Sequence, residues 1–275
     1  MRIAVTGGSG RVGRYIIPEL VSNGHETINV DIIDHPLPGA QFRAADLNQY
    51  DRALAAFQDA EAIVHMARSS SDRKPETVFA VNVTTTWNVL QAALELGVKK
   101  CVLASSVNAI GAVFSRELVP PEYFPIDEDH PTRAEDAYSQ SKWVGEQIAD
   151  GFARRSNVQI ASFRFHGIVN DDSLSRYREN PNSDAQTNAK DFWGYLHVAD
   201  CARACRLALE GDWIGHQTFF INAADTTLTV STREALDTIF PGVPLVRNLP
   251  GFTSPLSIAK AKDLFGWAPQ ISWRE

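Results

Sequence analysis

Residues 2–13 read Arg-Ile-Ala-Val-Thr-Gly-Gly-Ser-Gly-Arg-Val-Gly, and this stretch decides the fold. It places a short apolar run directly before a glycine-rich turn, and residues 15–21 then carry apolar side chains at helical spacing. The stretch therefore predicts a strand, a turn and a helix, in that order. In such a unit Gly7 permits the tight turn, Gly10 lets the backbone approach a pyrophosphate, and Gly13 lets the helix pack on the strand.

The turn has the spacing Gly-x-x-Gly-x-x-Gly instead of Gly-x-Gly-x-x-Gly, so its interpretation depends on the strand and helix around it. In that setting the start of the helix, with Arg11 and Val12, offers free N–H groups and a positive dipole end to phosphates. The sequence therefore predicts a Rossmann-type dinucleotide site. A glycine- and serine-rich turn without a ligand is the alternative.

Asp31 ends a second predicted strand, at residues 26–30, about twenty residues after the glycines, as the dinucleotide fingerprint requires. A carboxylate there accepts hydrogen bonds from the adenosine ribose hydroxyls and repels a 2′-phosphate. Asp31 therefore favours NAD over NADP as the cofactor. Arg11, inside the glycine loop, is a cation that would suit the extra phosphate, so NADP remains the alternative.

Tyr138 and Lys142 are four residues apart and therefore lie on one face of a predicted helix. The lysine is a cation beside a phenol whose ordinary pKa is about 10. A neighbouring positive charge favours the phenolate, which is a base for an alcohol proton. Ser106, the second serine of a pair that ends a predicted strand, would donate to the substrate oxygen and stabilise the charge that develops there.

These residues resemble the extended short-chain dehydrogenase/reductase family, in its NAD-dependent epimerase/dehydratase group. The resemblance runs along nearly the whole chain. Besides the glycine turn and the Tyr-x-x-x-Lys pair, it is carried by Ala45-Asp46-Leu47, His65-Met66-Ala67, Val81-Asn82-Val83, residues 87–93, the Ser-Ser-x-x-x-x-Gly segment at residues 105–111, Phe163-Arg164-Phe165, the Tyr-x-His-Val-x-Asp segment at residues 195–200, and residues 265–269.

The resemblance, together with the residues themselves, implies a set of sites. The expected catalytic residues are Ser106, Tyr138 and Lys142. The expected cofactor-binding residues are Gly7, Gly10, Arg11, Val12, Gly13, Asp31, Asp46, Leu47, Met66, Ala67, Asn82, Tyr138 and Lys142. The expected substrate-binding residues are Ser69, Ser106, Asn108, Tyr138, Arg164 and Arg176. For Asn82 the alternative is helix packing, and for Ser69, Asn108 and Arg176 it is a solvated loop position.

Composition agrees with an α/β enzyme. The chain has 275 residues and a net charge of −7, without a Lys/Arg cluster, which argues against a nucleic-acid partner. No apolar run is long enough for a membrane span, and the odd number of cysteines, three, predicts no disulfide framework, so we expect the cytoplasm. His197, Cys201 and Cys205 have helical spacing, but buried cysteines are commoner than a metal site, and no metal is expected.

Alternating strands and helices predict a doubly wound parallel sheet with a small C-terminal substrate-binding cap. We expect residues 1–165 to form the NAD-binding domain, with residues 192–221 returning to it. Residues 166–191 and 222–275 would form the cap. Residues 115–135, rich in proline and acid, and the polar residues 170–191 are predicted to be long loops, the second of them mobile.

The resemblance favours an NAD-dependent dehydrogenase of a sugar or sugar acid, closest in form to the uronate dehydrogenase branch. A dehydratase would carry an acidic pair where this chain has Val107 and Asn108. An NAD-dependent epimerase of a sugar or nucleotide-sugar is the main alternative, and a non-catalytic NAD(P)-sensing protein is a minor one. We also expect a homo-oligomer, without a membrane partner.

Overall fold

The computed structural model describes residues 1–69 and 73–275, and its centre is a sheet of seven parallel strands. The strands follow the spatial order β3-β2-β1-β4-β5-β6-β9. Their bounds are β1 (Arg2–Thr6), β2 (Glu26–Asp31), β3 (Ala40–Ala44), β4 (Ala62–His65), β5 (Lys100–Ala104), β6 (Gln159–Phe165) and β9 (His216–Ile221). The order reverses between β1 and β4, where ligands of open α/β sheets bind. The predicted doubly wound fold is confirmed.

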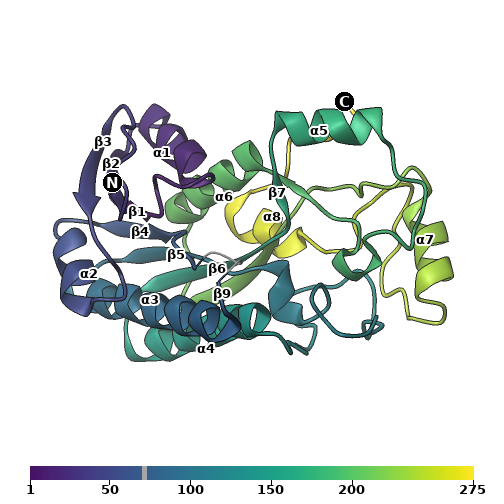
Figure 1. Ribbon diagram of the computed structural model, residues 1–275, viewed down its shortest axis with the longest axis horizontal. Helices are drawn as coiled ribbons and strands as arrows, with labels where there is room; N and C mark the ends of the chain where they lie inside the picture. Colours follow the sequence, from purple (N-terminus) through teal and green to yellow (C-terminus); the bar gives the residue numbers. More distant parts are fainter. Residues whose placement is uncertain (70–72) are drawn as a thin grey trace.

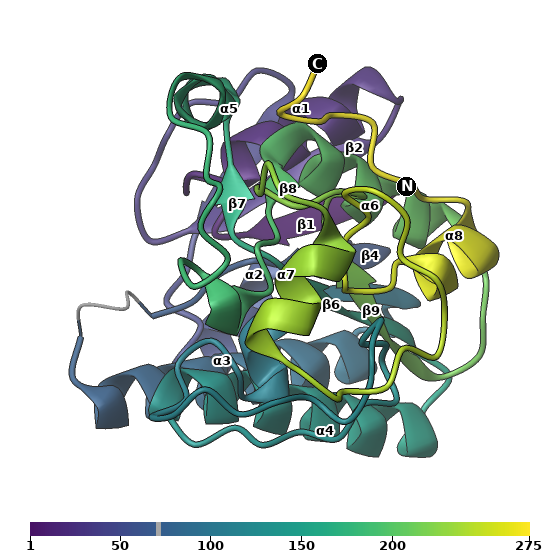
Figure 2. The ribbon, with the colours of Figure 1, turned by 90° about the vertical axis from the view of Figure 1, so that its right-hand side faces the viewer.

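Helices cover both faces of this sheet (Figures 1 and 2). One face carries α1 (Gly13–Ser22), α6 (Val198–Glu210) and α8 (Ala259–Phe265), and the other carries α2 (Tyr50–Ala56), α3 (Pro75–Glu95) and α4 (Ala137–Arg155). Successive side chains of β1 enter opposite cores, since Ile3 and Val5 pack with α1 and α6 whereas Ala4 packs on the other face. All seven residues of β6 are buried, as expected for a parallel strand covered on both sides.

The two long helices predicted near residues 76–96 and 136–154 are α3 and α4. Pro75 stands in the first turn of α3, where its missing N–H costs no hydrogen bond. Cys201 and Cys205 of α6 are free and buried against the sheet. Within the described ranges, none of the helices is both long and apolar enough to cross a membrane.

The cap is built from segments that follow the carboxyl ends of β5, β6 and β9, and it lies at the right of Figure 1. Its short elements are η1 (Val107–Ile110), β7 (Ile168–Val169), α5 (Asp171–Glu179), η2 (Ala189–Asp191), β8 (Leu196–His197) and α7 (Thr232–Ile239). Its apolar core joins distant parts of the chain: Val107, Ile110, Phe124, Phe192, Trp193, Phe220, Leu236, Phe240 and Leu256. The domain boundaries given above stay predictions.

Residues 170–191 are not one long loop, and that prediction was wrong. Asn170 caps α5, because its side-chain oxygen accepts a hydrogen bond from the backbone N–H of Ser173 at 3.2 Å. Leu174 is the single buried residue of this helix, and it packs with Tyr195 and Trp273. A helix with one apolar anchor has almost no periodic pattern, which is why the sequence suggested a loop.

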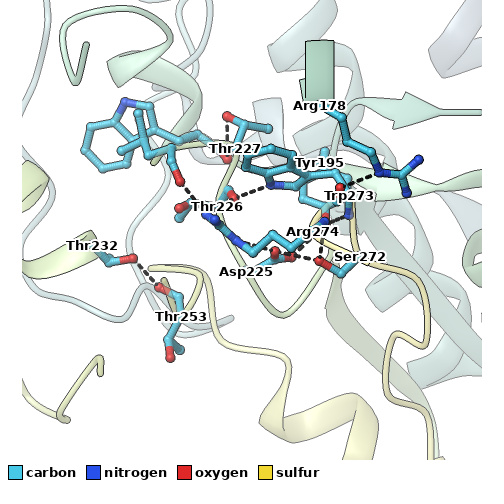
Figure 3. A network of polar contacts seen from close by, with 12 residues as sticks. Arg178, Tyr195, Asp225, Thr226, Thr227, Thr232, Thr253, Ser272, Trp273 and Arg274 are labelled. Carbon is cyan, nitrogen blue, oxygen red and sulfur yellow. Dashed lines mark hydrogen bonds and ion pairs between the residues drawn. The ribbon is translucent and has the colours of Figure 1, made fainter. Parts of the chain in front are cut away.

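Residues 270–274, which we call the C-terminal strap, join Tyr195, which precedes β8, to residues 225–226, which follow β9 (Figure 3). The backbone N–H of Trp273 donates to Tyr195 Oη at 3.0 Å, and its indole N–H donates to the carbonyl of Thr226 at 2.8 Å. Asp225 is the polar centre of this network. It accepts hydrogen bonds from the hydroxyls of Tyr195 and Ser272 and forms an ion pair with Arg274 at 3.0 Å.

Replacing Asp225 by alanine should therefore lower the free energy of unfolding by about 1–3 kcal/mol, because three donors lose a partly buried acceptor. The matched control is Asp237→Ala, since Asp237 is 59% exposed and forms an ion pair with Arg233 on the same helix. That change should cost less than about 1 kcal/mol. Chemical denaturation of both variants checks this, and equal losses would contradict a role for the strap.

Candidate active site

A cleft of about 1130 Å³ opens at the carboxyl edge of the sheet and brings most of the predicted site residues together. Its wall includes Gly7, Gly10, Arg11, Val12, Gly13, Asp31, Asp46, Leu47, Met66, Ala67, Ser69, Ser106, Asn108, Tyr138 and Lys142. Three predicted residues, Asn82, Arg164 and Arg176, are not part of this wall. Three that the sequence analysis did not single out, Arg68, Phe114 and His166, are.

The glycine loop is packed so tightly against the end of β4 and against itself that positions 7 and 13 have no room for a side chain. Gly7 has a φ of +66°, and a Cβ there would lie 2.9 Å from the backbone nitrogen of Ala67. A Cβ on Gly13 would lie 2.4 Å from the carbonyl oxygen of Gly7. The loop therefore leaves backbone N–H groups and the start of α1 facing the cleft, which fits the pyrophosphate of a dinucleotide.

Two carboxylates mark the other end of the cleft. Asp31 ends β2 and accepts hydrogen bonds from the backbone N–H groups of Ser9, at 3.1 Å, and Ile32, at 2.7 Å. These bonds fix the carboxylate beside the glycine loop, where it suits ribose hydroxyls. Asp46 accepts from the backbone and side chain of Asn48, and these hydrogen bonds hold the pKa of its carboxyl below the ordinary range.

Helix α4 carries the predicted base. Asp136 caps it by accepting from the backbone N–H groups of Tyr138 and Ser139, both at 3.0 Å, so the helix begins just before the tyrosine. One turn later the ammonium of Lys142 donates to the carbonyl of Ala104 at 2.6 Å, at the end of β5. Its Nζ atom lies 5.7 Å from the ring centre of Tyr138. The cation and the phenol therefore face the cleft as a pair.

Ser106 begins the turn that follows β5. Its hydroxyl accepts from the backbone N–H of Asn108 at 3.2 Å and lies 3.0 Å from that residue's side-chain oxygen. Gly111 closes this turn with a φ of +88°, and a Cβ there would lie 2.2 Å from the carbonyl carbon of Arg133. The backbone N–H of Arg133 in turn donates to Ile110 at 2.9 Å. Glycine is thus required at the end of the serine motif because residues 133–134 cross it.

Arg68 is a second cation, besides the expected Lys142, whose charge acts on the proposed base Tyr138. Burial raises the pKa of Tyr138 above its ordinary value, and the hydrogen bond with Ser106 and the charge of Arg68 oppose that rise. Burial likewise lowers the pKa of Lys142 to about 8, and the charge of Arg68 lowers it further. Arg68 therefore supplies an electrostatic effect on the tyrosine that we had expected from Lys142 alone.

Asn82 and Arg164 support the site from behind the cleft. The side chain of Asn82 accepts from the backbone N–H of Ser69 at 2.9 Å and donates to Ser141 Oγ at 3.0 Å, so it fastens α3 to α4. The guanidinium of Arg164 makes two hydrogen bonds, of 3.0 and 2.9 Å, to the carboxylate of Glu146. Both partners of this ion pair are at least 94% buried, which removes Arg164 as a partner for a substrate carboxylate.

Arg176 is exposed on α5, and its guanidinium donates to Ser173 one turn earlier on the same helix. The sequence predicted that Arg176 lies in a loop beside the site. The structure places it on α5, and it is not part of the cleft wall. His166 directly follows β6 with both ring nitrogens hydrogen-bonded to backbone, and burial lowers its pKa to about 4. It is therefore neutral at neutral pH.

Known proteins match both the sequence and the fold. A family model described as "NAD dependent epimerase/dehydratase family" matches residues 3–219. The L-arabinose 1-dehydrogenase (NAD(P)(+)) of Haloferax volcanii is 27% identical over 76% of this chain and 82% of its own. The UDP-glucose 4-epimerase of Corynebacterium glutamicum is 25% identical over 98% and 91%. A solved structure titled "Mutated Uronate Dehydrogenase" shares the fold with a TM-score of 0.71 and 23% identity, over 99% and 82%.

The position of Tyr138 on the cleft wall predicts the effect of removing its hydroxyl oxygen. Tyr138→Phe should reduce turnover at least about a hundredfold, the usual loss for a general base, with little change in NAD affinity. Because the base acts as phenolate and the pKa of Tyr138 is raised, wild-type oxidation should accelerate as pH rises above neutral. Tyr15→Phe, an exposed tyrosine of α1, is the control. Near-normal turnover in Tyr138→Phe would exclude this residue as the base.

Proposed function

The chain belongs to the NAD dependent epimerase/dehydratase family, and we propose that it is an NAD-dependent dehydrogenase of a sugar or sugar acid. The observation that carries this proposal is the meeting of Ser106, Tyr138 and Lys142 on one wall of the cleft, beside a glycine loop suited to a dinucleotide. The loop residues Gly7, Gly10 and Gly13 would hold the pyrophosphate. Asp31 would hold the adenosine ribose, and Asp46 and Leu47 the adenine.

The side chains divide the chemistry of alcohol oxidation between them. The Tyr138 oxygen takes the proton of the substrate hydroxyl, and Ser106 donates a hydrogen bond to the same substrate oxygen. The ammonium of Lys142, held by the carbonyl of Ala104, stabilises the phenolate form of the tyrosine. The chemistry that NAD supplies when bound is acceptance of a hydride from the carbon that carries this oxygen.

Two features favour a dehydrogenase of a free sugar. The arabinose dehydrogenase relative oxidises, by its name, a sugar without a nucleotide. The alignment with the Corynebacterium epimerase runs over 323 positions, although this chain has 275 residues, so this chain lacks segments that the epimerase has. We infer that the small cap encloses a small substrate. The location of the protein in the cytoplasm and its assembly into a homo-oligomer stay predictions.

An epimerase is the second candidate. The epimerase relative matches nearly the whole chain, and the same tyrosine, lysine and serine would serve an oxidation that is followed by re-reduction. An epimerase must turn its keto intermediate over before the hydride returns, whereas a dehydrogenase releases it. The two reactions therefore differ in whether NADH accumulates.

The test is to incubate the purified protein with NAD and a panel of aldoses, uronic acids and UDP-glucose, and to follow NADH absorbance and sugar composition. Stoichiometric NADH is the expected result. Isomer interconversion without net NADH would establish an epimerase and overturn the proposal. Binding of NAD with neither reaction, on the free sugars and on UDP-glucose, would make the protein a non-catalytic NAD-binding protein.

Asp31 should determine the choice of cofactor. Asp31→Ala removes the acceptor for the ribose hydroxyls and the charge that repels a 2′-phosphate. The ratio of kcat/KM with NADP to that with NAD should rise roughly tenfold, or about 1.4 kcal/mol. Asp34→Ala, an exposed aspartate that is not part of the cleft wall, is the matched control. A wild-type enzyme that already prefers NADP would show that Arg11 dominates.

A further inference from the structure

The wall of the cleft carries the cations Arg68 and Lys142 along with the residues of the predicted chemistry, Ser106 and Tyr138. The nearby carboxylate of Asp136 is already bonded to two backbone N–H groups at the start of α4. Lys142 has a role beside the tyrosine, and the charge of Arg68 opposes the rise in the pKa of Tyr138, but no step of the proposed proton transfer uses the hydrogen-bond donors of Arg68.

Within the part of the chain that the structure describes, the guanidinium of Arg68 has few partners. Its side chain is exposed and donates one hydrogen bond, of 3.0 Å, to the carbonyl of Ser69. No ion pair of Arg68 occurs among residues 1–69 and 73–275. A guanidinium has five N–H donors, and among the described residues Arg68 uses one of them, towards Ser69. By contrast, the buried Arg164 of β6 makes two hydrogen bonds to the carboxylate of Glu146.

The charge of Arg68 acts on the reacting groups of the cleft. Its charge acts on both Tyr138 and Lys142, and it disfavours the charged form of the lysine. Two cations held near each other in a partly buried cleft repel, unless an anion lies between or beside them. An anionic group bound there would relieve this repulsion.

We propose that Arg68 is the specificity-determining residue of this site and that it binds the carboxylate of a sugar acid while Tyr138 faces the hydroxyl to be oxidised. A planar guanidinium matches a carboxylate through two parallel hydrogen bonds, which a lysine cannot provide. Arg68 follows Ala67 directly at the end of β4, so its backbone is fixed beside the glycine loop. This inference rests on the proposed function and narrows its substrate class from sugars to sugar acids.

Arg68→Met tests the inference in matched reactions. Substrates are D-galacturonate and D-glucuronate, the neutral aldoses D-galactose and D-glucose, and UDP-glucose, whose negative charge lies on its diphosphate. The loss of charge beside Tyr138 should lower kcat for every substrate alike. The ratio of kcat/KM for an acid to that for its neutral aldose should fall about ten- to hundredfold, mostly through KM, as for a charged hydrogen bond. In Arg68→Lys this ratio of acid to neutral aldose should be partly restored.

The control is Arg233→Met, because Arg233 is 61% exposed on α7, outside the cleft, and the ratio should not change. An unchanged ratio in Arg68→Met, a loss confined to UDP-glucose, or a loss of NAD affinity alone would overturn the inference and leave the proposed function standing. The opposite case, in which the proposed function fails but the inference holds, is tested by calorimetric binding of galacturonate to the NAD-loaded protein. Binding that depends on Arg68 without any oxidation would refute the dehydrogenase and retain the anion site. No binding of either acid would refute the inference.

Discussion

The buried carboxylate of Glu146 holds the catalytic surface together. It receives two hydrogen bonds from Arg164 on β6 and one, of 2.6 Å, from the hydroxyl of Ser105 at the end of β5. Glu146 itself stands one helical turn after Lys142 on α4. Removing one partner of such a buried pair costs about 3–5 kcal/mol, because the other charge is left without compensation. This interaction fixes α4 over two strand ends, so that Tyr138 and Ser106 face the same space.

Much of this arrangement was predictable because it follows from local patterns. The glycine turn between an apolar strand and an amphipathic helix determined the first βαβ unit, and the position of Asp31 followed from it. The tyrosine–lysine pair required only helical spacing, and the structure places both on α4, with Ser106 on the same wall of the cleft. Parallel strands bring their carboxyl ends to one edge, so motifs distant in sequence had to meet.

The remainder depends on contacts that no local pattern records. Arg164 looked available for a substrate because its partner, Glu146, lies eighteen residues earlier on another element. Helix α5 was missed because it has a single buried side chain, and its stability comes from Tyr195 and Trp273. Arg68 carries no motif of its own, and only the cleft geometry shows that it lies beside Tyr138. Its place immediately after the His-x-Ala segment was the one available signal.

The cap and the catalytic turn share one apolar core, because Val107 and Ile110 lie next to Ser106 and pack against residues from α7 and the segments around it. Residues 133–134 also cross this turn at Gly111. Such a cap is not a module that can be grafted from one relative onto another. Any exchange of its interior would move the serine hydroxyl relative to the tyrosine. Divergence of substrate range in this architecture is thus confined to side chains on the cleft wall, or else must proceed by concerted change in both parts.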